Sequence, residues 1–376
     1  MRTASGILAA FLLLSACDAS QDISSSTENA GKRLPVRYAK GFYVEAFPDH
    51  YRLVVRDPLD TLQVLDTYVL SQKQKFSDAH AGVVRIPITR LVSLSTTHVG
   101  FLTAIGQADA LAGFSGTKYL YDQDMQKGVT SGRISEIGGE GGLDLEKIIA
   151  LRPDMIMTYP TGNSGYNQTE KLKSLGLMPV MNNEFKELTP LGQAEWIKCI
   201  ALFFDAWDVA DSIFCSVEKD YLTISEQAVQ SQYRPTVFTG MAFKGEWTIP
   251  GGKSFAARYF QDAGAQYIWA DDTRTGNFPV AFSAVLERAV DADFWLHPGA
   301  AELRSDMTAA DPRYRYFTAW KNGAVYNNNL RQLPDGGNDY WEKGIVYPNL
   351  VLRDLVAIFH PEIMPRHNFT FYQQIP

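Results

Sequence analysis

The chain has 376 residues, of which 45% are hydrophobic, 20% charged and 12% aromatic. This length exceeds one ordinary core and fits two domains, and the composition excludes wholesale disorder. Thirty-five basic against 42 acidic residues give a net charge of −7, which excludes a protein that binds nucleic acid by charge attraction, and three Cys exclude a disulfide scaffold.

The N-terminus has the pattern of a secretory lipoprotein signal. A basic start precedes an apolar run over 7–14, about half of the ~20 residues that a membrane-spanning helix needs. Two small residues and Cys17 follow, in an order similar to the bacterial lipobox, whose Cys carries the lipid. The sequence predicts a signal peptide over 1–16, lipidation of Cys17, and a flexible tether over 17–33 that is too polar to bury a core. An ordinary signal peptide with a chance Cys is the alternative.

Residues 34–82 are predicted to form a small antiparallel β extension. β-type segments occur at 41–45, 51–55 and 62–70, and a Pro-Asp-His turn at 48–50 separates the first two.

From residue 83 onward, strands and helices alternate, which indicates a parallel sheet covered by helices on both faces. We expect an N-terminal α/β lobe over 83–188. Its strands are predicted at 91–95, 110–114, 155–159 and 178–181, and its helices at 96–105, 145–151 and 165–175.

Residues 189–230 break this rhythm, because their apolar residues recur at helical spacing almost throughout. Asp205 is predicted to cap a second helical segment there. Forty helical residues would measure ~60 Å at 1.5 Å per residue, so the region is interpreted as a rigid spine. Cys199 and Cys215 lie within it and are predicted to be buried thiols, with a disulfide as the alternative.

The alternation resumes over 231–376, which we interpret as a C-terminal α/β lobe. Strands are predicted at 236–239, 246–249, 293–296 and 324–326, and helices at 254–264, 281–289, 314–320 and, as a long closing helix, 341–359.

Three blocks of sequence are distinctive: RLVSLSTTH at 90–98, GLDLEKIIALRPDMI at 142–156, and the stretch from GNDYWE to PNLVLRDL within 337–355. Together they resemble the class III periplasmic substrate-binding lipoproteins of ABC importers, which deliver ferric siderophores, haem or cobalamin. The resemblance covers about residues 83–365. It implies two doubly wound α/β lobes joined by a long spine helix, with a ligand cleft between them, and here a small β extension at the N-terminus.

The function that this resemblance implies is the extracytoplasmic, lipid-anchored binding component of an ABC importer on the periplasmic side of a bacterial membrane. It would capture a ferric siderophore and deliver it to the permease. The implied partners are the permease and its ATPase, a metal-chelate small molecule, and the membrane through the lipid anchor. Cobalamin or haem is the alternative ligand. A secreted two-lobe enzyme and a partner lipoprotein without a small ligand are the alternatives of other classes.

In the family, one acidic residue on the rim of each lobe pairs with permease arginines. Glu146 matches the first by its place in the motif. The second is expected near 283, where this chain has Ser283, and Glu287 follows one turn later on the same side of the helix. For both glutamates, the alternative is an exposed helix residue, in the case of Glu146 one stabilised by the helix dipole.

The cleft candidates follow predicted strands, because a doubly wound sheet exposes its binding edge there. A large planar or chelated ligand needs aromatic walls and a few fixed donors. The ligand-binding candidates are Thr97, His98, Tyr119, Tyr159, Trp247, Phe278 and Arg331.

Each of these candidates has an alternative. The aromatic residues are equally suited to core packing. Guanidinium groups suit anionic siderophores, and Arg133 joins Arg331 as a candidate for that role. His98 is a candidate ligand for iron or a corrinoid metal, or else a histidine satisfied at a helix start.

Enzyme motifs are absent from the sequence, which has no Gly-x-Ser-x-Gly elbow, phosphate loop or His-Glu-x-x-His pair. The remaining His residues have no metal-ligand spacing. We therefore predict no catalytic residue, no resident metal, no cofactor and no nucleic-acid partner.

Overall fold

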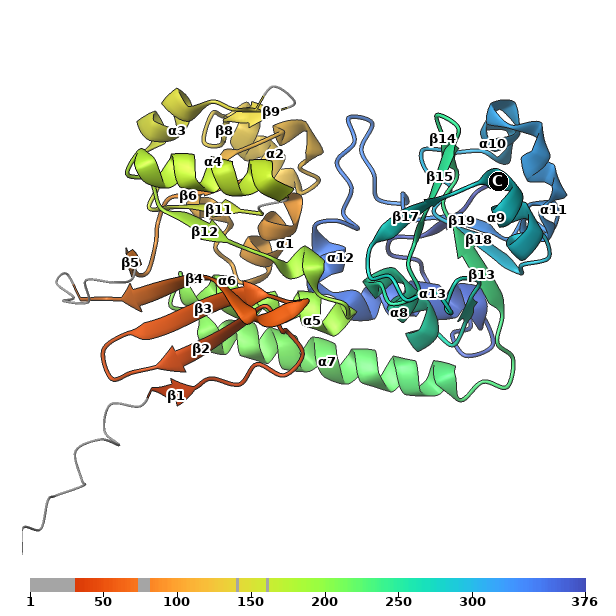
Figure 1. Cartoon of the computed structure of the whole chain (residues 1–376), viewed down its shortest axis with the longest axis horizontal. Coiled ribbons are helices and arrows are strands. Elements are labelled where there is room, and N and C mark those ends of the chain that lie inside the picture. Colours follow the sequence, from red (N-terminus) through yellow and green to blue (C-terminus); the bar gives the residue numbers. More distant parts are fainter. Residues whose placement is uncertain (1–30, 74–81, 140–141, 160–161) are drawn as a thin grey trace, which may run out of the picture.

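The computed structural model describes residues 31–73, 82–139, 142–159 and 162–376 (Figure 1). The predicted signal peptide, Cys17 and nearly all of the predicted tether lie outside the described residues. No helix in the described ranges combines the length and the apolar character that crossing a bilayer requires.

A five-stranded sheet precedes the α/β region. Its strands lie in chain order: β1 (Lys32–Arg33), β2 (Phe42–Ala46), β3 (Tyr51–Asp57), β4 (Asp60–Ser71) and β5 (Gly82–Arg85). The first four pair antiparallel, as predicted for the extension, whereas β5 pairs parallel to β4. Alternate residues such as Phe42 and Val44 are buried on one face, and the Phe42 ring lies 5.0 Å from that of Trp196. This face therefore packs on the helices that follow the first lobe.

Two buried carboxylates join the chain before β2 to those helices. The Glu195 carboxylate accepts hydrogen bonds from the backbone N–H groups of Arg37, Tyr38 and Ala39 at 2.6–3.0 Å. The Glu187 carboxylate accepts bonds from the N–H groups of Lys40 and Gly41, both at 2.8 Å. These carboxylates satisfy backbone donors that no strand pairs, and so they hold the extension to the body of the protein.

The N-terminal lobe contains a parallel sheet in the order β12-β11-β6-β7-β8. Its strands are β6 (Leu91–Ser93), β7 (Leu111–Phe114), β8 (Ser135–Glu136), β11 (Met155–Thr158) and β12 (Pro179–Met181), with a short β9–β10 pair (Gly138–Gly139, Gly142–Leu143) beside it. The helices are α1 (Thr96–Ala104), α2 (Gln123–Thr130), α3 (Leu145–Leu151) and α4 (Gly162–Ser174). Apolar cores lie on both faces of the sheet, as the alternation predicted.

The region between the lobes is helical but consists of three helices: α5 (Pro190–Ala194), α6 (Trp196–Leu202) and α7 (Trp207–Val229). α7 runs beneath both lobes (Figure 1), and its 23 residues span about 35 Å. The prediction that Asp205 caps α7 was wrong. Asp205 has a positive φ of 56° and accepts a bond from Gln72, while Ala206 is the residue before the helix. Both cysteines are free, but only Cys199 is buried, and Cys215 is exposed.

The C-terminal lobe contains a sheet in the order β16-β13-β18-β19-β20, parallel except for the last pair. The strands are β13 (Thr236–Thr239), β16 (Gln266–Tyr267), β18 (Phe294–Leu296), β19 (Val325–Asn327) and β20 (Gln373–Gln374), and β14 (Ala242–Phe243), β15 (Glu246–Pro250) and β17 (Asn277–Val280) form a separate antiparallel sheet. The helices are α8 (Phe255–Asp262), α9 (Phe282–Ala289), α10 (Arg304–Ala310), α11 (Thr318–Lys321), α12 (Lys343–Val346) and α13 (Pro348–Phe359).

The predicted closing helix over 341–359 is thus broken into α12 and α13. Tyr347, between them, has φ −117° and ψ 63°, outside the helical region. Pro348 explains the break, because its ring disfavours helical geometry in the preceding residue and it has no N–H to donate.

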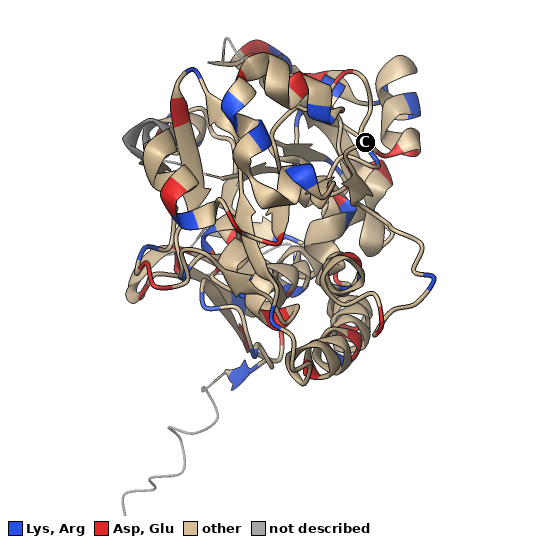
Figure 2. Cartoon of the chain, turned by 90° about the vertical axis from the view of Figure 1, so that its right-hand side faces the viewer, with Lys and Arg blue, Asp and Glu red and all other residues tan. Residues whose placement is uncertain are grey.

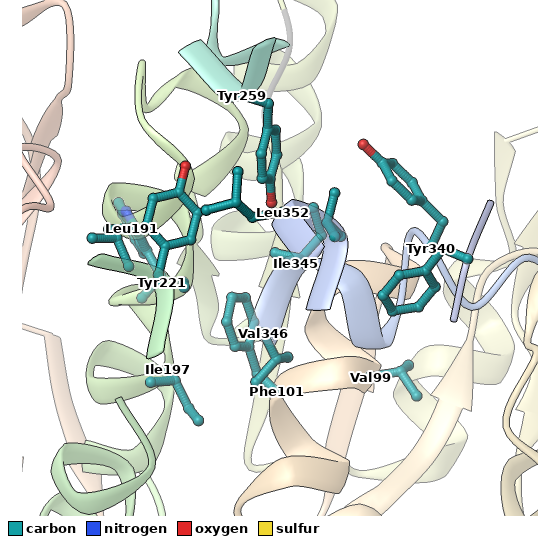
Figure 3. Close-up of a cluster of buried hydrophobic side chains, with 14 of the residues drawn as sticks. Val99, Phe101, Leu191, Ile197, Tyr221, Tyr259, Tyr340, Ile345, Val346 and Leu352 are labelled. Carbon is teal, nitrogen blue, oxygen red and sulfur yellow. The ribbon is translucent and has the colours of Figure 1, made fainter. Parts of the chain in front are cut away.

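The two lobes share an apolar core at their base (Figure 3). Phe101 of α1 lies beside Val346 of α12, and Val99 of α1, Tyr221 of α7 and Tyr259 of α8 belong to the same buried cluster. Charges, by contrast, are mixed in sign over the side of the molecule that the C-terminal lobe presents (Figure 2).

Candidate ligand-binding cleft

A cleft of about 910 Å³ lies between the lobes, at the edge where the strands of the N-terminal sheet end. Four strand ends supply one wall, as expected for a doubly wound sheet. The other wall comes from the segment after β19. The cleft is lined by Leu94, Ser95, Thr96, Phe114, Ser115, Gly116, Thr117, Lys118, Tyr119, Glu136, Gly138, Tyr159, Gly336, Asn338 and Trp341.

The second wall belongs to a segment, residues 331–347, that leaves the C-terminal sheet and packs against the N-terminal lobe. Two close approaches require glycine. A Cβ on Gly100 of α1 would lie 2.2 Å from the carbonyl oxygen of Glu342, and one on Gly337 would lie 2.9 Å from that of Leu120. The Glu342 carboxylate also accepts bonds from the N–H groups of Tyr121 and Asp122. We call this segment the interlobe strap.

Three aromatic residues line the cleft while remaining partly exposed. Tyr119 is 43% exposed, Tyr159 42% and Trp341 44%. The Tyr159 ring lies edge-on to His98 at 6.4 Å, and the Trp341 ring lies edge-on to Tyr340 at 4.8 Å. Large aromatic faces held in this way are suited to stack on a flat ligand.

The cleft holds one carboxylate, Glu136, at the end of β8. It accepts bonds from the N–H groups of Gly116, Thr117 and Gly138 and from the Thr117 hydroxyl, at 2.6–3.0 Å. Burial by itself would raise the pKa of Glu136, but these donors outweigh it and hold the pKa below its ordinary value. The side chain is therefore ionised at neutral pH.

The start of α1 faces the cleft through Ser95 and Thr96. No side chain caps the N-terminus of this helix. Ser95 is the N-cap residue, and its hydroxyl bonds to the Thr97 hydroxyl at 2.9 Å instead of capping the helix. Thr97 in turn donates to the Glu184 carboxylate at 2.5 Å, so the structure places it behind the cleft wall rather than among the lining residues.

His98 is fully buried behind the same wall. Its Nδ1 lies 3.0 Å from the Ser93 hydroxyl, and its Nε2 has no hydrogen-bond partner among the described residues. Burial lowers the pKa of His98 to about 3, so the ring is neutral. It supports Tyr159 from behind rather than lining the cleft.

Three further candidates are also placed away from the lining. Trp247 is fully buried in an aromatic core of the C-terminal lobe, where its indole N–H donates to the Thr239 carbonyl. Phe278 on β17 is half-buried, with the Arg274 guanidinium 3.9 Å from its ring. Arg331, the first residue of the interlobe strap, lines a different cavity, of about 660 Å³.

The structure therefore brings together two of the seven ligand-binding candidates, Tyr119 and Tyr159. No sequence pattern indicates that Glu136 or Trp341 lines the cleft. Glu136 belongs to a two-residue strand with no periodicity, and Trp341 was assigned to the closing helix. Among described residues, no group of three His, Cys, Asp or Glu is arranged to hold a metal ion.

The two docking candidates are exposed on different lobes. Glu146 lies in the first turn of α3, whose N-cap Asp144 accepts a bond from the Lys147 N–H at 3.0 Å. Glu287 lies on α9, and Ser283 on the same helix is exposed as well. Figure 1 shows α3 and α9 on opposite lobes.

Comparison with known proteins agrees with this architecture. Residues 91–328, more than half of the chain, match the model of the family described as periplasmic binding protein. An uncharacterized lipoprotein of Methanocaldococcus jannaschii is 29% identical over 309 residues, which are 80% of this chain and 72% of the relative.

Two solved structures show the same fold. An ABC-type Fe3+-hydroxamate transport system protein from Saccharomonospora viridis matches with a TM-score of 0.56 and 21% identity, over 73% of this chain and 94% of the other. The periplasmic vitamin B12 binding protein of Vibrio cholerae matches with a TM-score of 0.53 and 15% identity, over 74% of this chain and 99% of the other. The predicted two-lobe fold and the resemblance to class III binding proteins are thereby confirmed.

Proteins of this family bind substrates and are not enzymes, and they work with an ABC permease and its ATPase. The match over 91–328 and the cleft between the two lobes together identify the family of this chain. It belongs to the periplasmic binding protein family.

Proposed function

We propose that this chain is the lipid-anchored binding component of an ABC importer and that it captures a metal chelate between its lobes. The observation that carries the proposal is the cleft of about 910 Å³, where Tyr119, Tyr159 and Trp341 offer partly exposed rings at the boundary of the two lobes. A chelate with a flat or rounded apolar face would cover these rings, which are otherwise in contact with water.

A ferric siderophore and cobalamin are the two ligand classes to test. A hydroxamate-iron transport protein supports the first and a vitamin B12 binding protein supports the second, since both share this fold. Haem is the third, because a periplasmic heme binding protein of Pseudomonas aeruginosa has the same fold, with a TM-score of 0.55.

Ligand titration of the purified chain tests the proposal. We expect one of the three chelates to bind saturably and to quench tryptophan fluorescence, because Trp341 lies in the cleft. Trp341→Phe should remove most of the quenching. Tyr159→Ala should weaken binding by about two- to tenfold, since an aromatic contact contributes about 0.5–1.5 kcal/mol.

Tyr316→Ala is the matched control, because Tyr316 is exposed on the C-terminal lobe and does not line the cleft. Its affinity should equal that of the unaltered chain. If none of the chelates binds, or if Tyr159→Ala and Tyr316→Ala behave alike, the cleft is not the binding site.

We propose further that Glu146 and Glu287 dock on the permease. Both are exposed carboxylates, one on each lobe, and neither lines the cleft. Glu146→Ala and Glu287→Ala should therefore bind the chelate normally but reduce its uptake by cells. Glu226→Ala, an exposed change on α7, serves as the control. Full uptake by both docking variants would contradict the assignment.

Lipidation of Cys17 is part of the same proposal. It is supported by the order of residues around Cys17 and by the lipoprotein named among the relatives. Cys17→Ser should move the chain from the membrane fraction to the soluble fraction and abolish the incorporation of labelled palmitate. A Cys17→Ser chain that still sediments with membranes would contradict it.

A further inference from the structure

We propose that the cleft selects chelates without net negative charge, and that Glu136 is a residue that determines this specificity. The inference rests on the proposed function and specifies its ligand class. It begins with the charges of the wall. Of the fifteen residues that line the cleft in the described part of the chain, one is acidic, Glu136, and one is basic, Lys118. Their formal charges cancel.

The negative charge of Glu136 is fixed in place. Each of its carboxylate oxygens accepts two hydrogen bonds, from Gly116 and Gly138 on one oxygen and from the N–H and hydroxyl of Thr117 on the other. These donors keep the group ionised and hold it at the cleft. A carboxylate or catecholate oxygen of a ligand in the cleft would be repelled by this carboxylate, because its four hydrogen bonds keep it from rotating out of the cleft.

The positive charge in the cleft is of a different kind. Lys118 is exposed, and its ammonium group lies 4.9 Å from the centre of the Tyr119 ring. A single ammonium does not match the several oxygen charges of a polyanionic chelate, for which bidentate guanidinium groups are suited.

The guanidinium groups that the sequence suggested for this role are engaged elsewhere. Arg331 pairs with the buried Asp339 at 3.1 Å and lies against Tyr121, in the second cavity of about 660 Å³. Arg133 lies 3.8 Å from Asp109 and bonds to backbone carbonyls of its own lobe. Neither lines the cleft. Apart from Lys118 and the N–H groups at the start of α1, a polyanion would therefore lose its water of hydration there without gaining matching partners.

The rest of the wall fits a ligand that is flat and carries neutral acceptors. Tyr119, Tyr159 and Trp341 provide ring faces. Ser115 and Asn338 contribute neutral polar groups. Amide and carbonyl oxygens are the acceptors that such donors bind without any need for charge. The ligand class is a near-neutral metal chelate with a broad apolar face and peripheral amide groups, as in a corrinoid.

Calorimetric titration of the full-length chain against probes of different charge tests this selection. The neutral probes are cyanocobalamin and a ferric trihydroxamate. The anionic probes are haemin and a ferric tris-catecholate. We expect a neutral probe to bind at least ~100-fold more tightly than either anion, with cyanocobalamin preferred because it combines a flat ring system with amides.

Glu136→Gln tests the residue itself. In this variant the ratio of anion affinity to neutral-probe affinity should rise roughly tenfold. Glu226→Gln on α7 changes the net charge equally and should alter neither affinity. Ser115→Arg places a guanidinium in the cleft without disturbing the bonds of Glu136, and should likewise admit anions.

The outcomes separate this inference from the function on which it rests. Anions that bind as tightly as neutral probes overturn the inference while the proposed function stands. Neutral binding with no gain of anion affinity in either Glu136→Gln or Ser115→Arg overturns the role of charge in the cleft. A chain that binds no chelate of any charge removes the proposed function and the inference together.

Discussion

Lys198 and Glu195 form an ion pair at 3.0 Å in which neither side chain has any solvent exposure. Such a pair is not a strong source of stability in itself, because both charges lose their hydration. Its effect here is positional. The Lys198 ammonium pairs with the Glu195 carboxylate. The same carboxylate also accepts hydrogen bonds from the backbone N–H groups of Arg37, Tyr38 and Ala39. The pair thus organises the link between the β extension and the helices.

Glu195→Gln should lower the free energy of unfolding by about 3 kcal/mol, because it leaves a buried ammonium short of a partner. Lys198 keeps Asp211, at 2.8 Å, which limits the loss. Denaturant titration measures the change, with Glu226→Gln as an exposed control expected within about 0.5 kcal/mol of the unaltered chain. Hydrogen exchange at residues 37–39 should quicken in Glu195→Gln alone. A loss below 1 kcal/mol with unchanged exchange would contradict this description of Glu195.

At the scale of single residues, the sequence predicts little of the cleft. The residue types at Trp247 and Tyr159 are equally suited to a wall or a core, and only the packing places the first inside the C-terminal lobe and the second at the cleft. Glu136 depends on backbone donors about twenty residues earlier in the chain, and no local pattern indicates such a contact.

Among the elements, α3 is held by its N-cap residue. The Asp144 carboxylate accepts a bond from the Lys147 N–H, and the ionised group lies favourably at the positive end of the helix dipole. Helix bonds lower the pKa of Asp144 below its ordinary value, so this cap persists at neutral pH.

Asp144→Ala should therefore lower the free energy of unfolding, whereas Asp144→Asn, which also caps, should lower it much less. Urea denaturation measures both. Chelate affinity should stay unchanged in both variants, because α3 does not line the cleft. Equal losses for Ala and Asn would show that the cap is not the source of the stability.

Elements were the best predicted level of this structure. Buried strands such as Leu91–Ser93 and Met155–Thr158 are short apolar runs between turn signals, and these patterns are local. The errors fell where a single residue overrides the pattern. Pro348 divides the closing helix, and the left-handed backbone at Asp205 ends one helical segment before α7 begins. The parallel pairing of β5 depends on a partner strand and has no local signature.

At the scale of the whole molecule, the two lobes are connected by α7 and, in addition, by the interlobe strap. Its Glu342 carboxyl, which bonds to N–H groups of the N-terminal lobe, is largely buried. Burial raises the pKa of Glu342 from 4.5 to about 8, and the N–H donors of Tyr121 and Asp122 offset only part of that rise.

Because the fold raises this pKa, the protonated form is favoured in the folded state. The contribution of Glu342 to stability is full below pH 4.5 and is lost as pH rises toward about 8. Glu342→Gln resembles the protonated acid, so its free energy of unfolding should fall less across this window than that of the unaltered chain. Denaturant titrations from pH 5 to about 9 measure the difference. Parallel pH curves for the two proteins would show that Glu342 does not titrate in this range.

The two-lobe plan could be predicted from the sequence, because alternation and a long helical stretch are regular patterns. The interlobe strap could not. The strap depends on contacts such as that of Gly100 with Glu342, two residues that are far apart in the sequence. The cleft wall formed by the strap depends on the same long-range contacts, so the sequence does not predict that Trp341 lines the cleft.

The interlobe strap has a consequence for how a ligand would be bound and released. Gly336, Asn338 and Trp341 are fastened to the same body that carries Tyr119, although the chain reaches them from the opposite body. A rotation of the C-terminal lobe would therefore change access to the cleft more than it changes the positions of the lining residues. A ligand would then bind to a site whose walls are in place before it arrives.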